Sequence, residues 1–285
     1  MSPRPPSSGL FELPPDHLGL SDPSYLERRS RIAEIGAAYR PGGPIPDVTY
    51  TAEEDDLWRM VSTELTAKHQ RLACRELVAA SQELSLPTTR VPQLREVDER
   101  LDHLSRFRIR PVPGLVPTRT FYGSLAARTF SSTQYVRHPS VPFYTPEPDI
   151  VHEIIGHATM LASPTVADVY AAAGQASLRC ESDDALAFFS RVFWFTMEFG
   201  VVRQGPDLLA FGAGLLSSFA EIEVFQGADI RPWDIGAMGT LDYDIRQYQP
   251  VLFAASSFEA MVEDLTTFFV AFDEDHYRRL ASSAS

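Results

Sequence analysis

The chain has 285 residues, of which 44% are hydrophobic and 22% charged, and these proportions exclude a fibrous repeat or a wholly disordered protein. Its formal net charge of −13 at pH 7 repels phosphate groups, which argues against nucleic acid or anionic lipid as a partner. Cys74 and Cys180 are too few for a disulfide framework, and neither a secretory leader nor a membrane span is evident. We therefore expect a cytoplasmic protein that contacts neither nucleic acid nor membrane.

Helix signals outnumber strand signals several-fold along the chain. Ser21-Asp22-Pro23 supplies cap candidates for the first helical stretch, and Thr51 is a typical capping residue at the start of the second. Prolines limit the segment 108–116 to an edge strand or an extended loop. The apolar spacing predicts helices over 25–39, 51–84 with one break near Lys68, 121–130, 150–160, 184–203, 215–225 and 257–272. We therefore expect a mainly α protein of the α+β class, with a small β component.

The segment PDIVHEIIGH contains two histidines, His152 and His157, in an apolar helical pattern. Zinc peptidases place two histidines four residues apart, about 40° from each other around the helix axis. His152 and His157 are five residues apart, about 140°, so they can bind one ion only if the helix ends or distorts between them. Gly156 permits such a distortion. The alternative is that the two histidines are unrelated.

A carboxylate interrupts the apolar run 193–199, in which Glu198 has mainly aromatic neighbours. A buried, unpaired carboxylate costs several kcal/mol, so Glu198 needs a cation or a proton. Arg191 is the alternative partner, seven positions away on the same helix face. Two histidines and one carboxylate are typical of non-haem Fe(II) sites, and Zn²⁺ with the same ligands and a water is the competing interpretation.

Three nearby segments are ambiguous on their own. GAGLLSS at 212–218 could contact an anion through its backbone or simply begin a helix. YTPEPD at 144–149 is first of all a proline-stiffened loop that leads into the His152 helix. The pair Arg137-His138 could bind a carboxylate through the guanidinium, or pair with a surface acid.

Taken together, TQYVRH, YTPEPDIVHEIIGH, WFTMEFG and GAGLLSS, in this order and spacing, closely resemble the catalytic domain of the pterin-dependent aromatic amino acid hydroxylases. The resemblance extends over residues 16–277. We therefore assign 16–280 to one catalytic domain, flanked by a flexible proline-rich tail at 1–15 and a short tail at 281–285. The resemblance implies a mostly helical basket that uses Fe(II), tetrahydropterin and O₂, with an aromatic amino acid as its small-molecule substrate.

The resemblance also assigns roles to individual residues. It implies that Fe(II) is held by His152, His157 and Glu198. It implies that the substrate carboxylate is held by Arg137, Thr145 and Ser217, and that its ring is walled by Trp194 and Phe199. The pterin contacts correspond to Val116, Thr118, Phe121 and Glu153. Two candidate catalytic side chains follow from the same match, Glu153 near the iron without ligating it and Tyr243 near the pocket.

The chain departs from the family pattern in several places. The family reads G-H-V-P-L-L where this chain has GHATML at 156–161, so the wall beside the second histidine differs in shape. We expect no regulatory domain before the catalytic part, and no long C-terminal helix of the kind by which animal members form tetramers. We therefore expect a monomer or a weak dimer.

Few positions bear on substrate choice. Trp194 and Leu115 differ from the Phe and Tyr of tryptophan-specific members, whereas Ile245 is typical of that group. The balance predicts 4-hydroxylation of L-phenylalanine to tyrosine. The alternatives are a tryptophan hydroxylase or a phenylalanine 3-hydroxylase of the same family, a zinc hydrolase on the same three ligands, and a binding protein that retains the fold.

Overall fold

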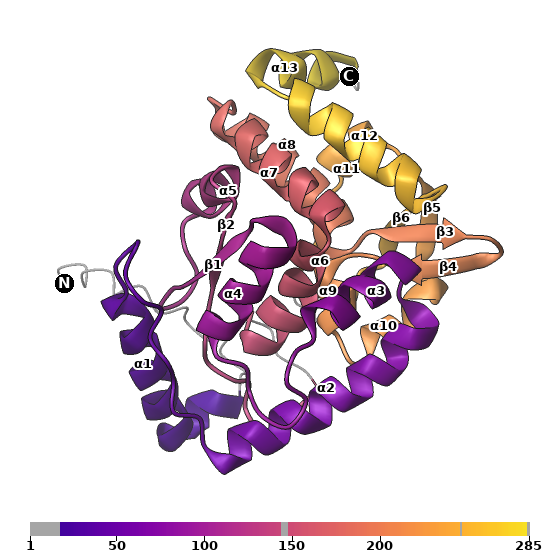
Figure 1. Ribbon diagram of the computed structural model, residues 1–285. Coiled ribbons are helices and arrows are strands. Elements are labelled where there is room, and N and C mark those ends of the chain that lie inside the picture. The colour runs from indigo at the N-terminus through magenta and orange to yellow at the C-terminus, as the bar shows by residue number, and fades with distance from the viewer. Residues whose placement is uncertain (1–17, 144–147, 246, 284–285) are drawn as a thin grey trace.

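Helices account for most of the fold in the computed structural model, which describes residues 18–143, 148–245 and 247–283 (Figure 1). The helices are η1 (Leu18–Ser21), α1 (Pro23–Ala38), α2 (Ala52–Leu72), α3 (Arg75–Leu84), α4 (Leu94–Ser105), α5 (Thr118–Ala126), η2 (His152–Ala158), α6 (Thr159–Ala162), α7 (Pro164–Leu178), α8 (Asp183–Phe193), η3 (Trp194–Glu198), α9 (Ala213–Ser217), α10 (Glu221–Val224), η4 (Phe225–Gly227), α11 (Ile235–Thr240), α12 (Phe258–Ala271) and α13 (Glu274–Ser283). The strands are β1 (Arg108–Pro111), β2 (Thr129–Ser132), β3 (Val201–Gln204), β4 (Asp207–Ala210), β5 (Asp229–Pro232) and β6 (Val251–Ala255). The mainly α class with a small β component, expected from the sequence, is confirmed.

The first two long helices begin where their capping residues predict. Asp22 accepts two backbone N–H groups of the first turn of α1, at 2.9 and 3.1 Å, and Thr51 forms a capping box at the start of α2. The predicted break near Lys68 is wrong, because α2 continues to Leu72. The chain turns at Cys74 instead, whose backbone N–H donates to the carbonyl of Ala210 at 3.0 Å. This turn depends on a distant strand and is therefore invisible in the local sequence.

Three predicted helical stretches are shorter than expected because tertiary contacts end them. The stretch 121–130 begins earlier, as α5, and its last residues belong to β2, which pairs in parallel with β1. The stretch 184–203 is divided into α8, η3 and β3, and 215–225 into α9, α10 and the start of η4. The expected helix at 257–272 is confirmed as α12. The C-terminal helix α13 extends to Ser283, so residues 281–283 are helical where a tail was expected.

Strands in the described part of the chain form one two-stranded sheet, β1-β2, and one four-stranded sheet in the order β4-β3-β6-β5. The hairpin β3-β4 is antiparallel, and β6 lies parallel to both β3 and β5. Strands of four or five residues within a helix-rich chain leave little alternation to detect. The sequence therefore revealed only the strand at 108–111, which had been expected as an edge strand or loop.

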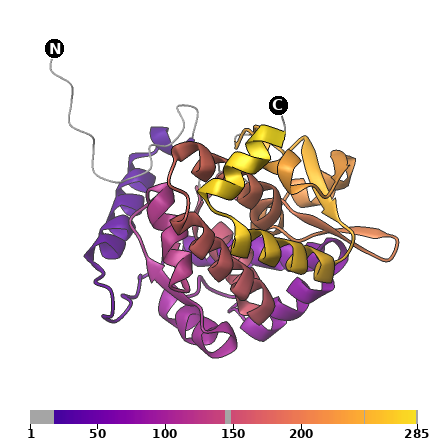
Figure 2. The ribbon, with the colours of Figure 1, turned by 90° about the horizontal axis from the view of Figure 1, so that it is seen from above.

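The core lies around α7, which packs against α5, α6 and α12. Figures 1 and 2 show α1 at one edge of the molecule and the β3-β4 hairpin at the opposite edge, with α7 between them. Fully buried aromatic side chains, among them Tyr170, Phe189 and Phe269, fill the space between α7, α8 and α12. Among the described residues, no helix is long and apolar enough to cross a membrane.

Candidate metal centre

The helix that carries the two histidines is widened, and this resolves the five-residue spacing. His152 and His157 lie on η2, a π-helical segment in which backbone hydrogen bonds close over five residues, as from Thr159 N–H to the Ile154 carbonyl. In such a segment a residue five positions further along returns to the same side of the helix, so both imidazoles lie on one face. The predicted distortion between the histidines is therefore present. It takes the form of a wider helix rather than a helix end.

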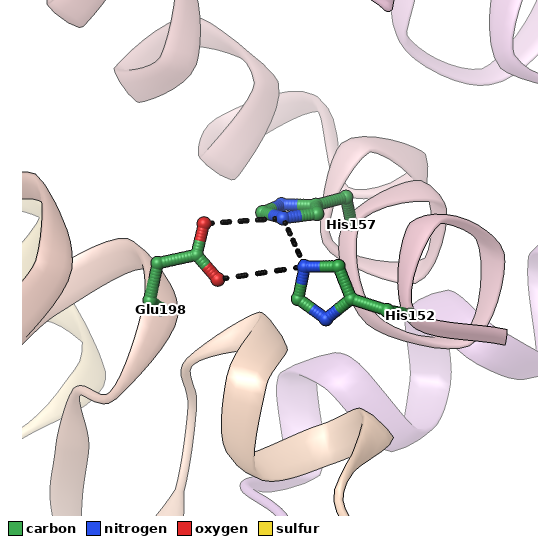
Figure 3. A group of neighbouring side chains, drawn as sticks. All are labelled: His152, His157 and Glu198. Atoms are coloured by element: carbon green, nitrogen blue, oxygen red, sulfur yellow. Dashed lines mark hydrogen bonds and ion pairs between the residues drawn. The ribbon is translucent and has the colours of Figure 1, made fainter. Parts of the chain in front are cut away.

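The carboxylate lies on a second π-helical turn, η3, which follows directly from α8. The backbone N–H of Phe199 donates to the carbonyl of Trp194 at 2.9 Å, again over five residues. This turn brings the Glu198 side chain toward η2, with the carboxylate facing the two imidazoles across the gap between the segments (Figure 3). π-helical turns are rare and occur frequently at functional sites.

The three side chains converge on a single point. The Nε2 atoms of His152 and His157 lie 3.1 Å apart, and the Glu198 oxygens lie 3.1 Å from Nε2 of His157 and 3.8 Å from Nε2 of His152. The candidate ligand atoms all lie within 4.8 Å of one another. Donor atoms that are each about 2 Å from one ion lie about 3 Å apart. These separations therefore suit a shared metal ion.

Hydroxyl groups hold the outer nitrogen of each imidazole. Nδ1 of His152 lies 2.8 Å from Oγ of Ser217, and that hydroxyl donates to the Ala213 carbonyl at 2.8 Å. Nδ1 of His157 lies 2.8 Å from the Tyr170 hydroxyl, which donates to Sδ of Met160 at 3.4 Å. Because each hydroxyl donates elsewhere, it accepts from the imidazole Nδ1–H. Each Nε2 then presents a lone pair to the centre, as a metal ligand requires.

Close packing fixes the distance between η2 and α9. A Cβ atom at Gly156 would lie 2.8 Å from the Ala213 carbonyl oxygen, closer than real Cβ contacts. Gly156 therefore lets α9 approach the histidine helix closely enough for Ser217 to reach His152. Gly214, on α9, has a similar role on the other side, since a Cβ there would lie 2.6 Å from the Phe199 ring.

Burial and mutual charge shift the ionisation of the cluster. Burial, reinforced by the neighbouring His157, lowers the pKa of His152 to about 4, so this imidazole is neutral at pH 7. Burial also disfavours the charged form of His157, but the adjacent Glu198 carboxylate outweighs it and raises the pKa of His157. The same pairing keeps the pKa of Glu198 below its usual value despite burial. Burial raises the pKa of Glu153 to about 8.

Three aromatic side chains form a cluster beside Glu198, since Phe199 follows it directly and Trp194 begins the same helical turn, η3. Trp194 stacks on Tyr243, with ring centroids 4.2 Å apart and planes 8° apart, and lies 4.6 Å from the Phe199 ring. Trp194 is half-buried, and Tyr243 is 37% exposed. We call Trp194, Phe199 and Tyr243 the ring wall.

Comparison with known proteins identifies the family. Residues 10–280 match the family described as biopterin-dependent aromatic amino acid hydroxylases. The chain belongs to this family. The match confirms the family predicted from the linked motifs and, with it, the iron and tetrahydropterin that this hydroxylase uses.

Several relatives match most of this chain, and the match covers a different share of each relative's own length. Phenylalanine 3-hydroxylase of Streptomyces coeruleorubidus is 43% identical over 269 residues, which cover 94% of this chain and 96% of the relative. Phenylalanine-4-hydroxylase of Dictyostelium discoideum is 39% identical over 92% of this chain, and tyrosine 3-monooxygenase of Bos taurus is 40% identical over 89%. This chain spans only 60% and 52% of the lengths of these two relatives.

A solved structure shows the same fold with a metal. The crystal structure of Chromobacterium violaceum phenylalanine hydroxylase with bound oxidised Fe(III) is similar with a TM-score of 0.77 and 25% identity. The likeness covers 88% of this hydroxylase and 92% of that chain. The donor set of two imidazoles and one carboxylate, with positions left open, fits such an iron.

The sequence left other partners open for Glu198 and for the pair Arg137-His138. Arg191 does not pair with Glu198; its guanidinium donates to Asp242 at 2.8 Å. His138 lies 3.3 Å from the Asp22 carboxylate, as the surface-pair alternative for this histidine predicted.

Arg137 forms a buried ion pair with Asp149. Its Nε and Nη2 donate to the two oxygens of Asp149 at 2.9 and 2.8 Å, and both side chains are almost fully buried. Asp149 also accepts the backbone N–H of His152 at 3.2 Å, which links this pair to η2. Thr145, the other residue assigned to the substrate carboxylate, lies outside the described residues.

The residues assigned to the pterin lie at different depths. Phe121 is half-buried and contacts Phe130 edge-to-face at 5.5 Å, and Phe130 in turn lies 4.7 Å from the His157 ring. Glu153 is buried, with one oxygen 3.3 Å from the backbone N–H of Thr133. Val116 is half-buried and Thr118 exposed, at the entry to α5. Their pterin contacts stay predictions.

Sequence reasoning missed three residues that orient the site. Asp149 carries a signal, since an acid directly before the histidine helix could have been paired with Arg137. Tyr170 lies on α7, a helix that the sequence did not reveal, and nothing in the sequence links it to His157. The third is Gln249, whose amide oxygen accepts the indole N–H of Trp194 at 3.0 Å.

Proposed function

We propose that this hydroxylase inserts one atom of O₂ into the aromatic ring of L-phenylalanine. The observation that carries the proposal is the convergence of His152, His157 and Glu198 beside an aromatic wall. Fe(II) at these ligands, together with a tetrahydropterin, would supply the electrons that activate O₂. The protein itself then has to hold the ring against that position and keep water out.

Arg137 supports recognition of an amino acid carboxylate. Two of its guanidinium nitrogens are held by Asp149, while Nη1 has only a long contact of 3.5 Å to the Pro142 carbonyl among the described residues. A pre-oriented guanidinium presents Nη1 to a carboxylate without losing side-chain entropy on binding. Because Asp149 also accepts from the His152 backbone, the carboxylate site and the metal ligands share one support. Thr145 and Ser217 complete this proposed site.

The ring wall supports a substrate with a single six-membered ring. Trp194 packs against both Tyr243 and Phe199, and these contacts hold its indole in place. An indole would need volume that Trp194 occupies. Ile245 is exposed at 55%, so it exerts less influence on the ring than Trp194 does.

Tetrahydropterin is proposed to bind on the opposite side of the centre, near α5. Phe121 would stack on its ring, with Val116 and Thr118 at the edge and Glu153 as a polar contact. The support is that Phe121 reaches the His157 ring through a single intervening ring, Phe130. The aromatic contacts would exclude water from this side.

Two carbons of the phenylalanine ring are candidates for hydroxylation. The sequence predicts the 4 position, with tyrosine as the product. The 3 position is favoured by the similarity to the Streptomyces coeruleorubidus 3-hydroxylase, which extends over nearly the whole of both chains. Tryptophan and tyrosine remain the alternative substrates.

Product analysis tests the proposal. The purified chain is incubated with Fe(II), a tetrahydropterin and O₂, and with phenylalanine, tyrosine or tryptophan in separate reactions, and products are separated chromatographically. We expect phenylalanine to give the highest kcat/KM, with 4-hydroxyphenylalanine as the main product; 3-hydroxyphenylalanine as the main product would establish the second candidate. Glu263→Ala, which removes an exposed carboxylate of α12, is the matched control and should retain activity. Absence of phenylalanine hydroxylation would overturn the proposal.

A further inference from the structure

Gln249 is a buried residue next to the ring wall, two residues before β6. It is 4% exposed, and each of its polar side-chain groups has a partner. Its Oε1 accepts from the Trp194 indole N–H at 3.0 Å, and its Nε2 donates to the carbonyls of Asp244 and Gln247, each at 3.0 Å. A side-chain amide has one carbonyl and two N–H bonds, so this arrangement uses it fully. An inverted amide would place an N–H group against the indole N–H, so only one orientation satisfies the site.

The same amide holds both layers of the wall. Trp194 is held directly, through its indole N–H. Tyr243, which stacks on Trp194, precedes Asp244, and the Asp244 carbonyl is one of the two that accept from Gln249. The stacked pair is therefore held by one side chain, whose hydrogen bonds go to the wall and its neighbouring carbonyls and not to the metal ligands.

The backbone of Gln249 is anchored to the segment that orients the metal ligands. Its N–H donates to Oε1 of Glu221 at 2.7 Å, and Glu221, at the start of α10, is 7% exposed. Four residues earlier, Ser217 at the end of α9 holds Nδ1 of His152. The α9-α10 segment thus contacts Gln249 at one end and the metal ligand His152 at the other.

These contacts form a continuous path from one metal ligand to another. From His152 the path runs through Ser217 and α9-α10 to Glu221, from there through Gln249 to Trp194, and along η3 from Trp194 to Glu198. The links are three hydrogen bonds, the turn at 218–220 between α9 and α10, and the helical turn η3. Trp194 is therefore connected to both His152 and Glu198.

We propose that Gln249 is a positioning residue that holds the Trp194 indole at a set distance from the metal ligands and thereby selects the ring carbon that is hydroxylated. This inference rests on the proposed function, since it assumes that Trp194 walls the substrate ring. The 3 and 4 positions of a phenyl ring are neighbours, so a small displacement of the wall exchanges the carbon that faces the iron. An indole without its hydrogen bond can rotate, and the substrate ring can then follow it.

The test combines one measurement on the free protein with one on the products. Gln249→Leu removes all three side-chain hydrogen bonds, and Gln249→Glu keeps a carboxyl oxygen that can accept from the indole N–H. Gln226→Leu is the matched control, because that glutamine donates to the Leu208 carbonyl at 2.9 Å and does not contact the wall. The chain contains three tryptophans, so Trp194→Phe assigns the Trp194 indole signal in a ¹⁵N NMR spectrum.

In the free protein, Gln249→Leu should accelerate hydrogen exchange of the Trp194 indole N–H by about tenfold, as expected for loss of one buried hydrogen bond. Gln249→Glu and Gln226→Leu should leave it close to the wild-type rate. This measurement needs no iron, pterin or substrate. A wild-type chain that makes no product would therefore count against the proposed function while the exchange data still report on Gln249.

In the product assay, Gln249→Leu should raise the fraction of the minor ring isomer severalfold and increase pterin oxidation without hydroxylation. Gln249→Glu should restore the wild-type ratio. In a Trp194→Phe background, which lacks the indole donor, Gln249→Leu should change the ratio no further. A product ratio that stays at the wild-type value in Gln249→Leu, while the indole exchanges faster or the melting temperature falls, would overturn the proposal and leave Gln249 a structural residue. If Gln249→Leu does not fold, the comparison of Gln249→Glu with Trp194→Phe decides, and equal isomer ratios in those two variants would overturn it as well.

Discussion

The metal ligands and the ring wall lie side by side but are held by different kinds of contact. The ligands lie on two π-helical turns, and each histidine is oriented by one hydroxyl, from Ser217 or Tyr170. The wall depends on ring stacking and on Gln249, and Tyr243 is 37% exposed. Rigid helical turns suit a group that must keep one geometry, whereas a partly exposed stack can differ between enzymes without disturbing the metal. The comparison predicts that changes on one side leave the other largely intact.

The largest effect is expected when a ligand is removed. Glu198→Ala should abolish turnover and iron binding, because one of three protein ligands is lost, while apolar burial maintains the fold. Iron content after dialysis and a circular dichroism spectrum measure the two effects. Glu153→Ala, one residue from a ligand, is the comparison variant and should keep its iron while pterin oxidation is slowed or uncoupled. Equal iron loss in both variants would show that the ligand assignment is wrong.

The next effect concerns the orientation of His157. Tyr170→Phe removes the hydroxyl that accepts from Nδ1 and should weaken metal affinity by about 10- to 100-fold. Competition against a chelator, with Co²⁺ as the probe, measures it. Tyr50→Phe, which removes a hydroxyl that donates to the Gln134 carbonyl at 2.8 Å, serves as the control. Affinity unchanged in Tyr170→Phe would mean that burial alone orients the ligand.

On the wall side, Trp194→Phe should alter specificity and spare the metal. The smaller ring makes room for an indole, so the tryptophan-to-phenylalanine ratio of kcat/KM should rise by about tenfold. Steady-state kinetics on both substrates, alongside iron content, provide the measurement. A fall in melting temperature and in activity toward both substrates alike would identify Trp194 as core packing only.

The smallest effect tests the link between the two sides. Burial raises the pKa of Glu221 from 4.5 to about 7, against the opposing hydrogen bond from Gln249. The folded state therefore holds this proton more tightly than the unfolded state, so the stabilisation is present below pH 4.5 and is lost as pH rises toward 7. In the unsubstituted chain, the free energy of unfolding should fall by on the order of 1 kcal/mol as the pH rises from 4.5 to 7. In Glu221→Gln this fall should be absent, because the side chain no longer titrates. Urea titrations of both proteins at several pH values measure it, and parallel pH profiles would contradict the shift.

The sequence alone determined the elements whose signals are local. Asp22 and Thr51 begin helices because their side chains bond to N–H groups three residues away or fewer, and the α12 pattern is a single amphipathic stretch. The candidate ligands were also evident, because a carboxylate among aromatic residues needs a partner wherever the chain folds. Linked motifs then identified the family.

Only the tertiary structure decided how those pieces meet. Periodicity does not distinguish an α-helix from a π-helical turn, so the five-residue spacing of the histidines could be explained only by the backbone of η2. Tyr170 and Gln249 act through partners 13 and 55 residues away, and Ser217 holds an imidazole 65 residues from it. Hydrogen bonds between distant residues leave no local pattern, because each residue type is compatible with many surroundings until the chain is packed.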